Sequence, residues 1–262
     1  MQQIYSILRQ TAREIAAAFP DPAFYRDFSL PVTRSREMYR ANPMVRGLSV
    51  YVMEETRSNL GHGLGHAEKV ALDAGAIAGI EAARANLSDQ AVDRLVLLAH
   101  CAGLLHDIRR RHRQHAVKGA EAAREKLTQD HLLDQESIAC IAFAIRNHEA
   151  FKDAQQPASR ECDILSGSLY DADKFRWGPD NFTHTVWKMI EAGPPPSLSG
   201  FIRLYPQALE YIAAIKNTFR TAVGRQYGPQ FIDIGLEIGR ELFRKMESDF
   251  KDYLPEDARP DI

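Results

Sequence analysis

The stretch Leu95-Val96-Leu97-Leu98-Ala99-His100-Cys101-Ala102-Gly103-Leu104-Leu105-His106-Asp107 places a long apolar run directly before a His-Asp pair. Its apolar residues recur at helical spacing, so we predict a buried helix that delivers His106 and Asp107 into the interior. Both side chains can bind a divalent metal, histidine through a ring nitrogen and aspartate through carboxylate oxygens. Adjacent helical residues diverge by about 100°, so further ligands would have to come from elsewhere in the chain.

The overall composition is that of a soluble globular protein. Of the 262 residues 45% are hydrophobic and 26% are charged, and the formal net charge is -2. This charge gives no general attraction to nucleic acid or to anionic membranes. No apolar stretch approaches the ~18 residues that cross a bilayer, and the N-terminus lacks the charged and apolar regions of a secretion signal. We therefore expect a cytoplasmic protein without a membrane or nucleic-acid partner.

The three cysteines, Cys101, Cys140 and Cys162, show no CxxC spacing. The first two lie in segments predicted to be helical. We interpret all three as structural thiols rather than as a disulfide or a zinc framework, which fits a reducing compartment.

Helical spacing of apolar residues recurs along the whole chain and predicts an all-α fold. The expected helices cover about residues 4–16, 44–60, 66–78, 88–105, 115–123, 137–148 and 165–175. Pro20, Pro22 and Pro31 predict an irregular segment after the first helix, with an aromatic cluster around Phe24. These rings either wall a substrate pocket or, as we favour, hold a loop against the core.

Beyond a turn at Gly193 to Pro196, two more amphipathic helices are expected around Ile212 and Ile238. Their apolar faces would pack on the same core or on a second subunit. We favour the same core, and a homodimer stays open.

Four residues outside the His-Asp pair are candidate ligands, and each has a plainer interpretation. His66 shares the apolar stripe of its helix, where a lone histidine is more often packed in the core. His148 ends a helix, where a protonated histidine is favourable. Asp171 and Asp173 lie about 200° apart on a helix, so we expect only one of them, Asp173, to face the core. His115 begins another predicted helix.

The basic run from Ile108 to Gln114 follows the His-Asp pair. It is either a solvated loop or a source of guanidinium groups for a substrate phosphate, for which the planar fork is well shaped. Arg109 and Arg110 are the candidates.

In chain order, His66, His106-Asp107 and Asp173 within Asp-Ala-Asp-Lys resemble the HD-domain superfamily of metal-dependent phosphohydrolases. His66-Ala-Glu-Lys-Val70, Leu-Leu-His-Asp-Ile, His115-Ala-Val-Lys-Gly119 and Ile145-Arg-Asn-His148 support the resemblance, which covers about residues 61–177. It implies a multi-helix bundle around a buried metal site, in which His66, His106, Asp107 and Asp173 hold one divalent ion. Some members bind a second ion with further histidines, and His115 and His148 match those positions.

Three departures from the patterns of known branches limit which members of the superfamily the chain resembles. No Gly-Tyr-Pro signature follows the motif, so the cyclic-dinucleotide branch is not supported. Arginines stand where guanosine-tetraphosphate hydrolases carry a Glu-Asp pair. His148-Glu149 replaces the two consecutive histidines of some binuclear members, which weighs against a second metal.

We accordingly predict an N-terminal helical extension over residues 1–60, an HD-like metal-binding core over residues 61–177, and C-terminal helices over residues 178–262 of the same compact domain. The mixed ligand set suits one or two divalent ions (Mn, Fe, Mg, Co, Ni or Zn) with positions open for water and substrate. Such an ion lowers the pKa of bound water towards about 7, so hydrolysis of a nucleotide or other small phosphoester is the expected reaction. Asp107 would act catalytically by linking the metal to the attacking water, while Arg109, Arg110 or Lys174 neutralises the phosphate.

Two alternatives stay open. A few members of this superfamily hold two irons and cleave C–C or C–P bonds with dioxygen, and all six candidate ligands for such a site are present. A non-catalytic protein that senses a nucleotide or binds a partner is the other.

Overall fold

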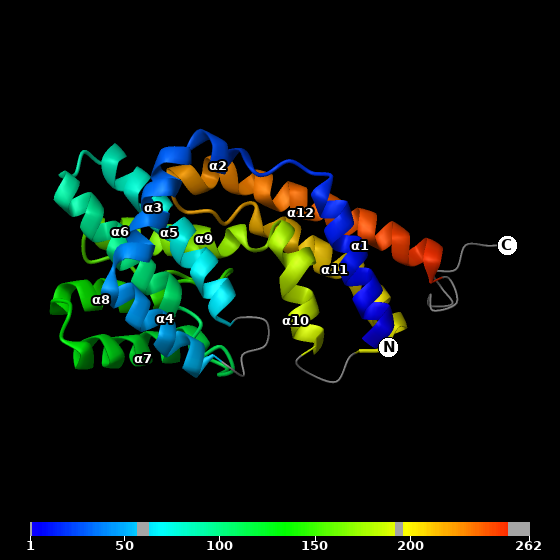
Figure 1. The fold of residues 1–262 in the computed structure, drawn as a ribbon, viewed down its shortest axis with the longest axis horizontal. Coiled ribbons are helices and arrows are strands. Elements are labelled where there is room, and N and C mark those ends of the chain that lie inside the picture. Colours follow the sequence, from blue (N-terminus) through cyan, green and yellow to red (C-terminus); the bar gives the residue numbers. More distant parts are fainter. Residues whose placement is uncertain (1, 57–62, 192–195, 251–262) are drawn as a thin grey trace.

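The computed structural model describes residues 2–56, 63–191 and 196–250 (Figure 1). Within these ranges the chain forms helices and no strand, which confirms the predicted all-α class. The helices are α1 (Gln2–Ala17), α2 (Ala23–Asp27), α3 (Ser29–Ala41), α4 (Pro43–Glu55), α5 (Leu64–Arg84), α6 (Asp89–Leu105), α7 (His115–Asp130), α8 (Gln135–Arg146), α9 (Arg160–Phe175), the π-helical turn η1 (Asn181–Thr185), α10 (Val186–Glu191), α11 (Leu198–Ile215) and α12 (Ala222–Asp249). None of the described helices combines the length and apolar character of a membrane span. The turn at Gly61 and His62 and the segment from Gly193 to Pro195 lie outside the described residues.

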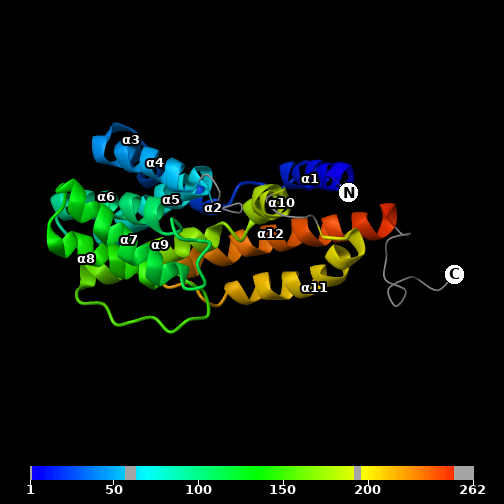
Figure 2. The same ribbon diagram turned by 90° about the horizontal axis from the view of Figure 1, so that it is seen from below.

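Two groups of helices lie side by side along the long axis of the molecule (Figures 1 and 2). One contains α3 to α9, with α5 packed on α6, α9 and α3. The other contains α1, α10 and α11, and α12 connects the two groups by contacting α5 and α9 as well as α1 and α11. The C-terminal helices therefore contact the core of the same chain. The boundaries at residues 60 and 177 stay a prediction.

Small residues allow α5 and α6 to approach closely. A Cβ added at Gly103 of α6 would overlap the backbone of Ala71 on α5, and α5 presents further buried alanines to its neighbours. A Cβ at Gly119 of α7 would lie 3.0 Å from the carbonyl oxygen of His106. These approaches bring the end of α6 and the start of α7 together beside the start of α5, which is where the candidate ligands lie.

The expected irregular segment after the first helix is wrong, because α2 and α3 occupy it. Pro22 precedes α2, and Pro31 is the third residue of α3. In a first turn the backbone N–H groups have no intrahelical acceptor, so proline costs nothing there. Phe24 is fully buried, with the rings of Phe28, Phe175 and Phe231 around it. The aromatic segment thus packs on the core as helix rather than as loop.

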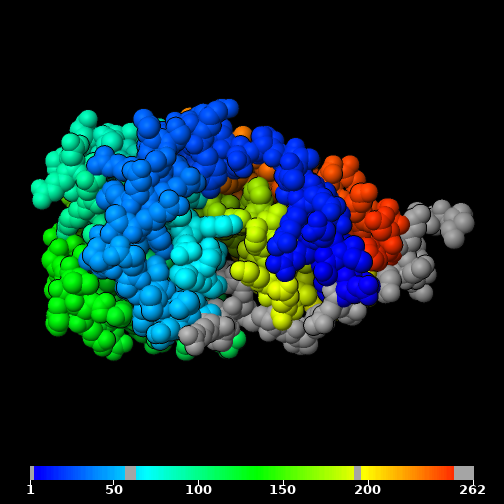
Figure 3. Space-filling model, in the orientation of Figure 1, coloured from blue at the N-terminus to red at the C-terminus, as the bar shows by residue number. Residues whose placement is uncertain are grey.

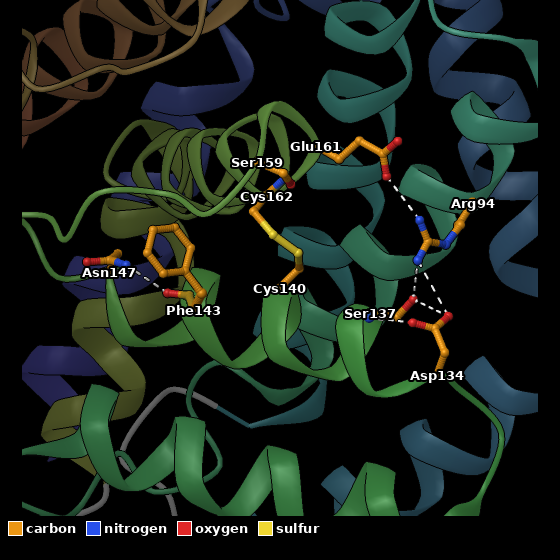
Figure 4. The surroundings of a disulfide bond; sticks show 9 residues. All are labelled: Arg94, Asp134, Ser137, Cys140, Phe143, Asn147, Ser159, Glu161 and Cys162. Atoms are coloured by element: carbon orange, nitrogen blue, oxygen red, sulfur yellow. Dashed lines mark hydrogen bonds and ion pairs between the residues drawn. A yellow bond between two sulfur atoms is a disulfide. The ribbon is translucent and has the colours of Figure 1, made fainter.

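The prediction of three free thiols is also wrong. Cys140 of α8 and Cys162 of α9 form a disulfide, with their Cα atoms 5.0 Å apart, while Cys101 is free and buried (Figure 4). Sequence spacing gave no sign of this pair because only the packing of α8 on α9 brings the two residues together. The cysteines consequently no longer support a reducing compartment.

Reduction of the Cys140–Cys162 disulfide is expected to lower the free energy of unfolding by about 3 kcal/mol, because the bond closes a loop between residues 22 positions apart. Urea unfolding with and without reductant measures the change. Thiol titration in denaturant should find one reactive thiol before reduction and three afterwards. Cys101→Ser is the control, since it leaves the sensitivity to reductant intact. Three reactive thiols in unreduced, denatured protein would contradict the assignment.

Candidate metal centre

Six histidine and aspartate side chains meet where five helices begin or end. His66 lies in the first turn of α5, and His106 and Asp107 directly follow α6. His115 is the first residue of α7, His148 follows α8, and Asp173 lies in the last turn of α9. They form two groups, His66 with His106 and Asp173, and Asp107 with His115 and His148. Within each group one ligand atom of every residue lies within 4.8 Å of the others.

Backbone carbonyls orient two of the imidazole rings. His106 Nδ1 lies 2.7 Å from the carbonyl oxygen of Gly103, and His148 Nδ1 lies 2.6 Å from that of Ile145. A carbonyl can only accept, so each Nδ1 carries the proton and each Nε2 keeps its lone pair. Such second contacts fix the ring and the tautomer of a metal-binding histidine.

The Nε2 atoms of His106 and His66 lie close to the other members of the first group. His106 Nε2 lies 3.3 Å from His66 Nε2 and 3.7 Å from Asp173 Oδ1, while His66 Nε2 lies 3.4 Å from the same carboxylate oxygen. These distances define the first group. They are too long for ideal hydrogen bonds in every case, yet close enough for one ion to contact all three residues.

Asp107 lies between the two groups. Its Oδ2 is 3.6 Å from His106 Nε2, whereas its Oδ1 is 3.5 Å from His148 Nε2 and 3.7 Å from His115 Nε2. One carboxylate therefore turns one oxygen to each group, an arrangement suited to bridging two ions. His106 is completely buried and Asp107 is 4% exposed.

The environment favours the protonation states that bind metal. Burial lowers the pKa of His106 to about 3 and also lowers that of His115, so both rings are neutral at neutral pH. Burial alone would raise the pKa of Asp107, but His106, His148 and Arg110 hold it well below its usual range. Burial is likewise outweighed at Asp173 by Lys174 and the neighbouring histidines, which lower its pKa. Neutral imidazoles and ionised carboxylates are the forms that ligate cations.

The three residues predicted to bind phosphate have different surroundings. Arg110 Nη1 donates to His115 Nε2 at 2.8 Å and lies 3.7 Å from Asp107 Oδ1, with 35% of the side chain exposed. Arg109 instead pairs with Glu55 of α4. The structure therefore brings Arg110 to the candidate ligands and turns Arg109 towards another helix.

Lys174 is buried behind the ligands rather than open to solvent. Its Nζ donates to Asp173 Oδ2 at 2.6 Å and to the carbonyl oxygen of His148 at 2.8 Å. One ammonium group thus connects a ligand of the first group with the backbone of a ligand in the second. This geometry suits a residue that positions ligands better than one that meets substrate.

The sequence did not predict the positions of two acidic residues, Asp171 and Glu149. Asp171 and Asp173 are both buried, although only one was expected to face the core, because α9 is enclosed around its whole last half. Asp171 accepts hydrogen bonds from the backbone N–H groups of Arg220 and Thr221 and so holds the start of α12. Glu149, whose Oε1 lies 3.8 Å from His115 Nδ1, was not predicted, and only its place beside His148 in the sequence could have indicated it.

The donor set fits a divalent ion in type and direction. Imidazole and carboxylate ligands suit Mn, Fe, Co, Ni and Zn, and the two carbonyl-oriented rings turn Nε2 towards the other ligands. His66, His106 and Asp173 would hold one ion, and Asp107, His115 and His148 a second.

Comparisons with known proteins add one structural likeness. No family model matches the chain, and no curated protein matches it. Among solved structures, the chain is similar to the crystal structure of a predicted HD superfamily hydrolase from an uncultured Thermotogales bacterium, at 19% identity and a TM-score of 0.46. The alignment covers 82% of this chain and 98% of the other. By its own residues, the chain resembles the HD-domain superfamily both in the order of His66, His106-Asp107 and Asp173 and in their meeting at one place in an all-helical fold.

Proposed function

We propose that this protein is a metal-dependent phosphohydrolase of the HD-domain type that acts on a nucleotide or another small phosphoester. The observation that carries the proposal is the meeting of two three-residue ligand groups around the shared carboxylate of Asp107. Divalent ions bound there supply Lewis acidity and acidify bound water, which is the chemistry that phosphoester hydrolysis needs.

The protein's own groups divide the remaining work. Asp107 is ionised and can accept a hydrogen bond from the attacking water, which orients that water. Arg110 is partly exposed beside the ligands and offers parallel N–H donors to phosphoryl oxygens. Lys174 holds Asp173 and the backbone of His148 in place. The burial of the cluster strengthens each of these electrostatic contacts.

A phosphate-release panel tests the proposal. Chelator-treated protein is reloaded separately with Mn, Co, Mg, Fe and Ni and offered nucleoside monophosphates, sugar phosphates and phosphodiesters. We expect turnover with at least one metal and one substrate class, and its loss on renewed chelation. Phosphate release from no combination would reject hydrolysis and favour a binding protein that recognises a phosphorylated ligand without turnover.

A diiron oxygenase is the second candidate, because both ligand groups contain two imidazoles and one carboxylate. Iron-loaded protein would then consume dioxygen in the presence of its substrate. Oxygen uptake without phosphate release from a phosphomonoester would move the assignment to this class.

Arg110→Gln is expected to lower kcat/KM for phosphoester hydrolysis about 10–100-fold, because a hydrogen bond to a charged group contributes about 1.5–3 kcal/mol. Arg109→Gln is the matched comparison from the neighbouring position. Its guanidinium pairs with Glu55, so we expect a change of less than about 3-fold, in the range of surface ion pairs. Steady-state kinetics on both variants checks this. Equal losses would show that the basic run acts as a diffuse charge and not through Arg110.

A further inference from the structure

A line of polar side chains leads away from the first ligand group between α5 and α9. Lys69 and Asp73 follow His66 at three and seven residues, so the three share one face of α5. Opposite them, Arg176 lies one helical turn beyond Asp173, and Asp180 follows in the next segment. Lys69 Nζ lies 2.6 Å from Asp180 Oδ1, and Arg176 pairs with Asp73 and with Asp180. The contact between His66 and Asp173 at the ligands is therefore followed by ion pairs that join Lys69 and Asp73 of α5 to Arg176 and Asp180.

The residues of these ion pairs line a cavity of about 280 Å³. Tyr25 of α2 and Arg36 of α3 line it together with Lys69, Asp73, Arg176 and the ring of Phe231. On the face drawn in Figure 3, the yellow-green chain after α9 shows in a hollow between the blue N-terminal helices and the cyan start of α5. The α-helical pitch is about 5.4 Å, so the near side of the cavity lies about one turn from the metal ligands.

Acidic and phenolic side chains around this cavity hold the Arg176 guanidinium in place. The residue is 8% exposed, its Nη1 bonds Asp180, and its Nη2 contacts Asp73 and the hydroxyl of Tyr25. Its Nε is buried and has no hydrogen-bond partner within the described part of the chain.

Acceptors stand beside these donors. Tyr25 donates its hydroxyl to Asp73 at 2.9 Å, and the carboxylate residues Asp73 and Asp180 both line the same cavity. Three basic residues (Arg36, Lys69 and Arg176) balance three acidic ones (Asp21, Asp73 and Asp180) around it. Because the charges of the lining residues balance, the cavity has no excess positive charge to favour a free anion. Hydroxyl groups, which donate to carboxylates and accept from guanidinium, match the lining, and the aromatic rings can pack on the C–H face of a sugar ring.

We propose that this cavity binds the hydroxyl-bearing, sugar-like part of the substrate whose phosphate lies at the metal ligands. The inference rests on the proposed hydrolase function and names its substrate class: sugar phosphates or nucleotides with free ribose hydroxyls. Arg36 donates to ring or hydroxyl oxygens, and Asp73, held by Tyr25, accepts from a hydroxyl group.

Two substitutions test the cavity, each with a matched control. Tyr25→Phe removes a hydroxyl bonded to a carboxylate, and Tyr227→Phe removes the equivalent bond to Asp27 on the surface. Arg36→Gln removes a cavity guanidinium, and Arg40→Gln removes one that lies a turn further along α3 outside the cavity. Kinetics compare p-nitrophenyl phosphate, which has no sugar hydroxyls, with ribose 5-phosphate, glucose 6-phosphate and adenosine monophosphate.

The cavity variants should lower kcat/KM for the preferred hydroxyl-bearing substrate about 5–10-fold while p-nitrophenyl phosphate changes less than 2-fold, the size expected for losing one hydrogen bond. Neither control substitution should change kcat/KM for either substrate. Equal losses on both substrate kinds, or no loss on either, would overturn the inference while leaving hydrolysis standing.

A binding measurement separates this inference from the hydrolase assignment. Saturation-transfer NMR with ribose, glucose, inositol and adenosine on chelator-treated protein needs neither metal nor turnover. We expect a signal from at least one compound that weakens in Tyr25→Phe and Arg36→Gln but not in Tyr227→Phe and Arg40→Gln. Such a result without any phosphate release would keep the cavity and reject the hydrolase. No signal from any of the four compounds would reject the cavity.

Discussion

Replacing His106 with alanine is expected to remove the metal of the first ligand group and to lower phosphate release by about 10³-fold or more. The side chain is fully buried, and its Nε2 contacts His66, Asp107 and Asp173. The substitution therefore removes a ligand of the first group that also contacts the shared carboxylate of Asp107. Loss of a catalytic ion costs several kcal/mol of transition-state stabilisation, which corresponds to this fold-change. Elemental analysis and phosphate release measure the two effects.

His112→Ala is the matched control because His112 is exposed in the segment between α6 and α7. It should retain wild-type metal content and activity. His106→Gln accompanies the alanine variant because it fills more of the buried space, and circular dichroism shows whether each variant keeps its helices. A folded His106 variant with the full metal content would show that this ring is a core residue and not a ligand.

Much of the architecture could be predicted from local sequence patterns. The apolar spacing from Leu95 to Leu105 specifies a helix, and a helix that ends in the core carries the next two residues there. The order of histidines and aspartates indicated the HD-domain resemblance. The structure then brings all six candidate ligands into two groups, although their roles as ligands and the assignment of each residue stay predictions until metal is measured.

What the sequence could not reveal depends on contacts between distant segments. Cys140 and Cys162 are joined only because α8 packs on α9. Arg109 and Arg110 are neighbours of the same chemical type, and only the position of Glu55 on α4 separates their surroundings. Asp171 looked exposed by helical angle because the pattern of α9 alone does not show that α12 begins against its far side. In each case the deciding partner is far away in the chain.

The second large effect concerns metal stoichiometry: wild-type protein saturated with Mn is expected to hold two ions per chain, and His115→Ala or His148→Ala one. Each histidine belongs to the group with Asp107, and removing either leaves an ion there with only two of its three protein ligands. His66, His106 and Asp173 are untouched, so the first ion should stay. Elemental analysis after equilibrium dialysis measures the content, with His184→Ala, a half-exposed histidine that contacts Asp180 and Thr183, as the control. One equivalent in wild type and both variants would reject the two-metal interpretation.

The two ions should also differ in affinity, and Arg110 is the reason. Its guanidinium donates to His115 Nε2, the nitrogen an ion in the second group would need, and it lies near Asp107 Oδ1 as well. An ion can bind there only when the guanidinium withdraws, and the two like charges then repel each other across a few ångströms. Mn titration should therefore show a tighter first site and a weaker second site. In Arg110→Gln the second site should tighten about 10-fold or more while the first changes little, even though phosphate binding weakens. A second site that is unchanged in Arg110→Gln would show that the arginine moves aside without cost and acts on the substrate alone.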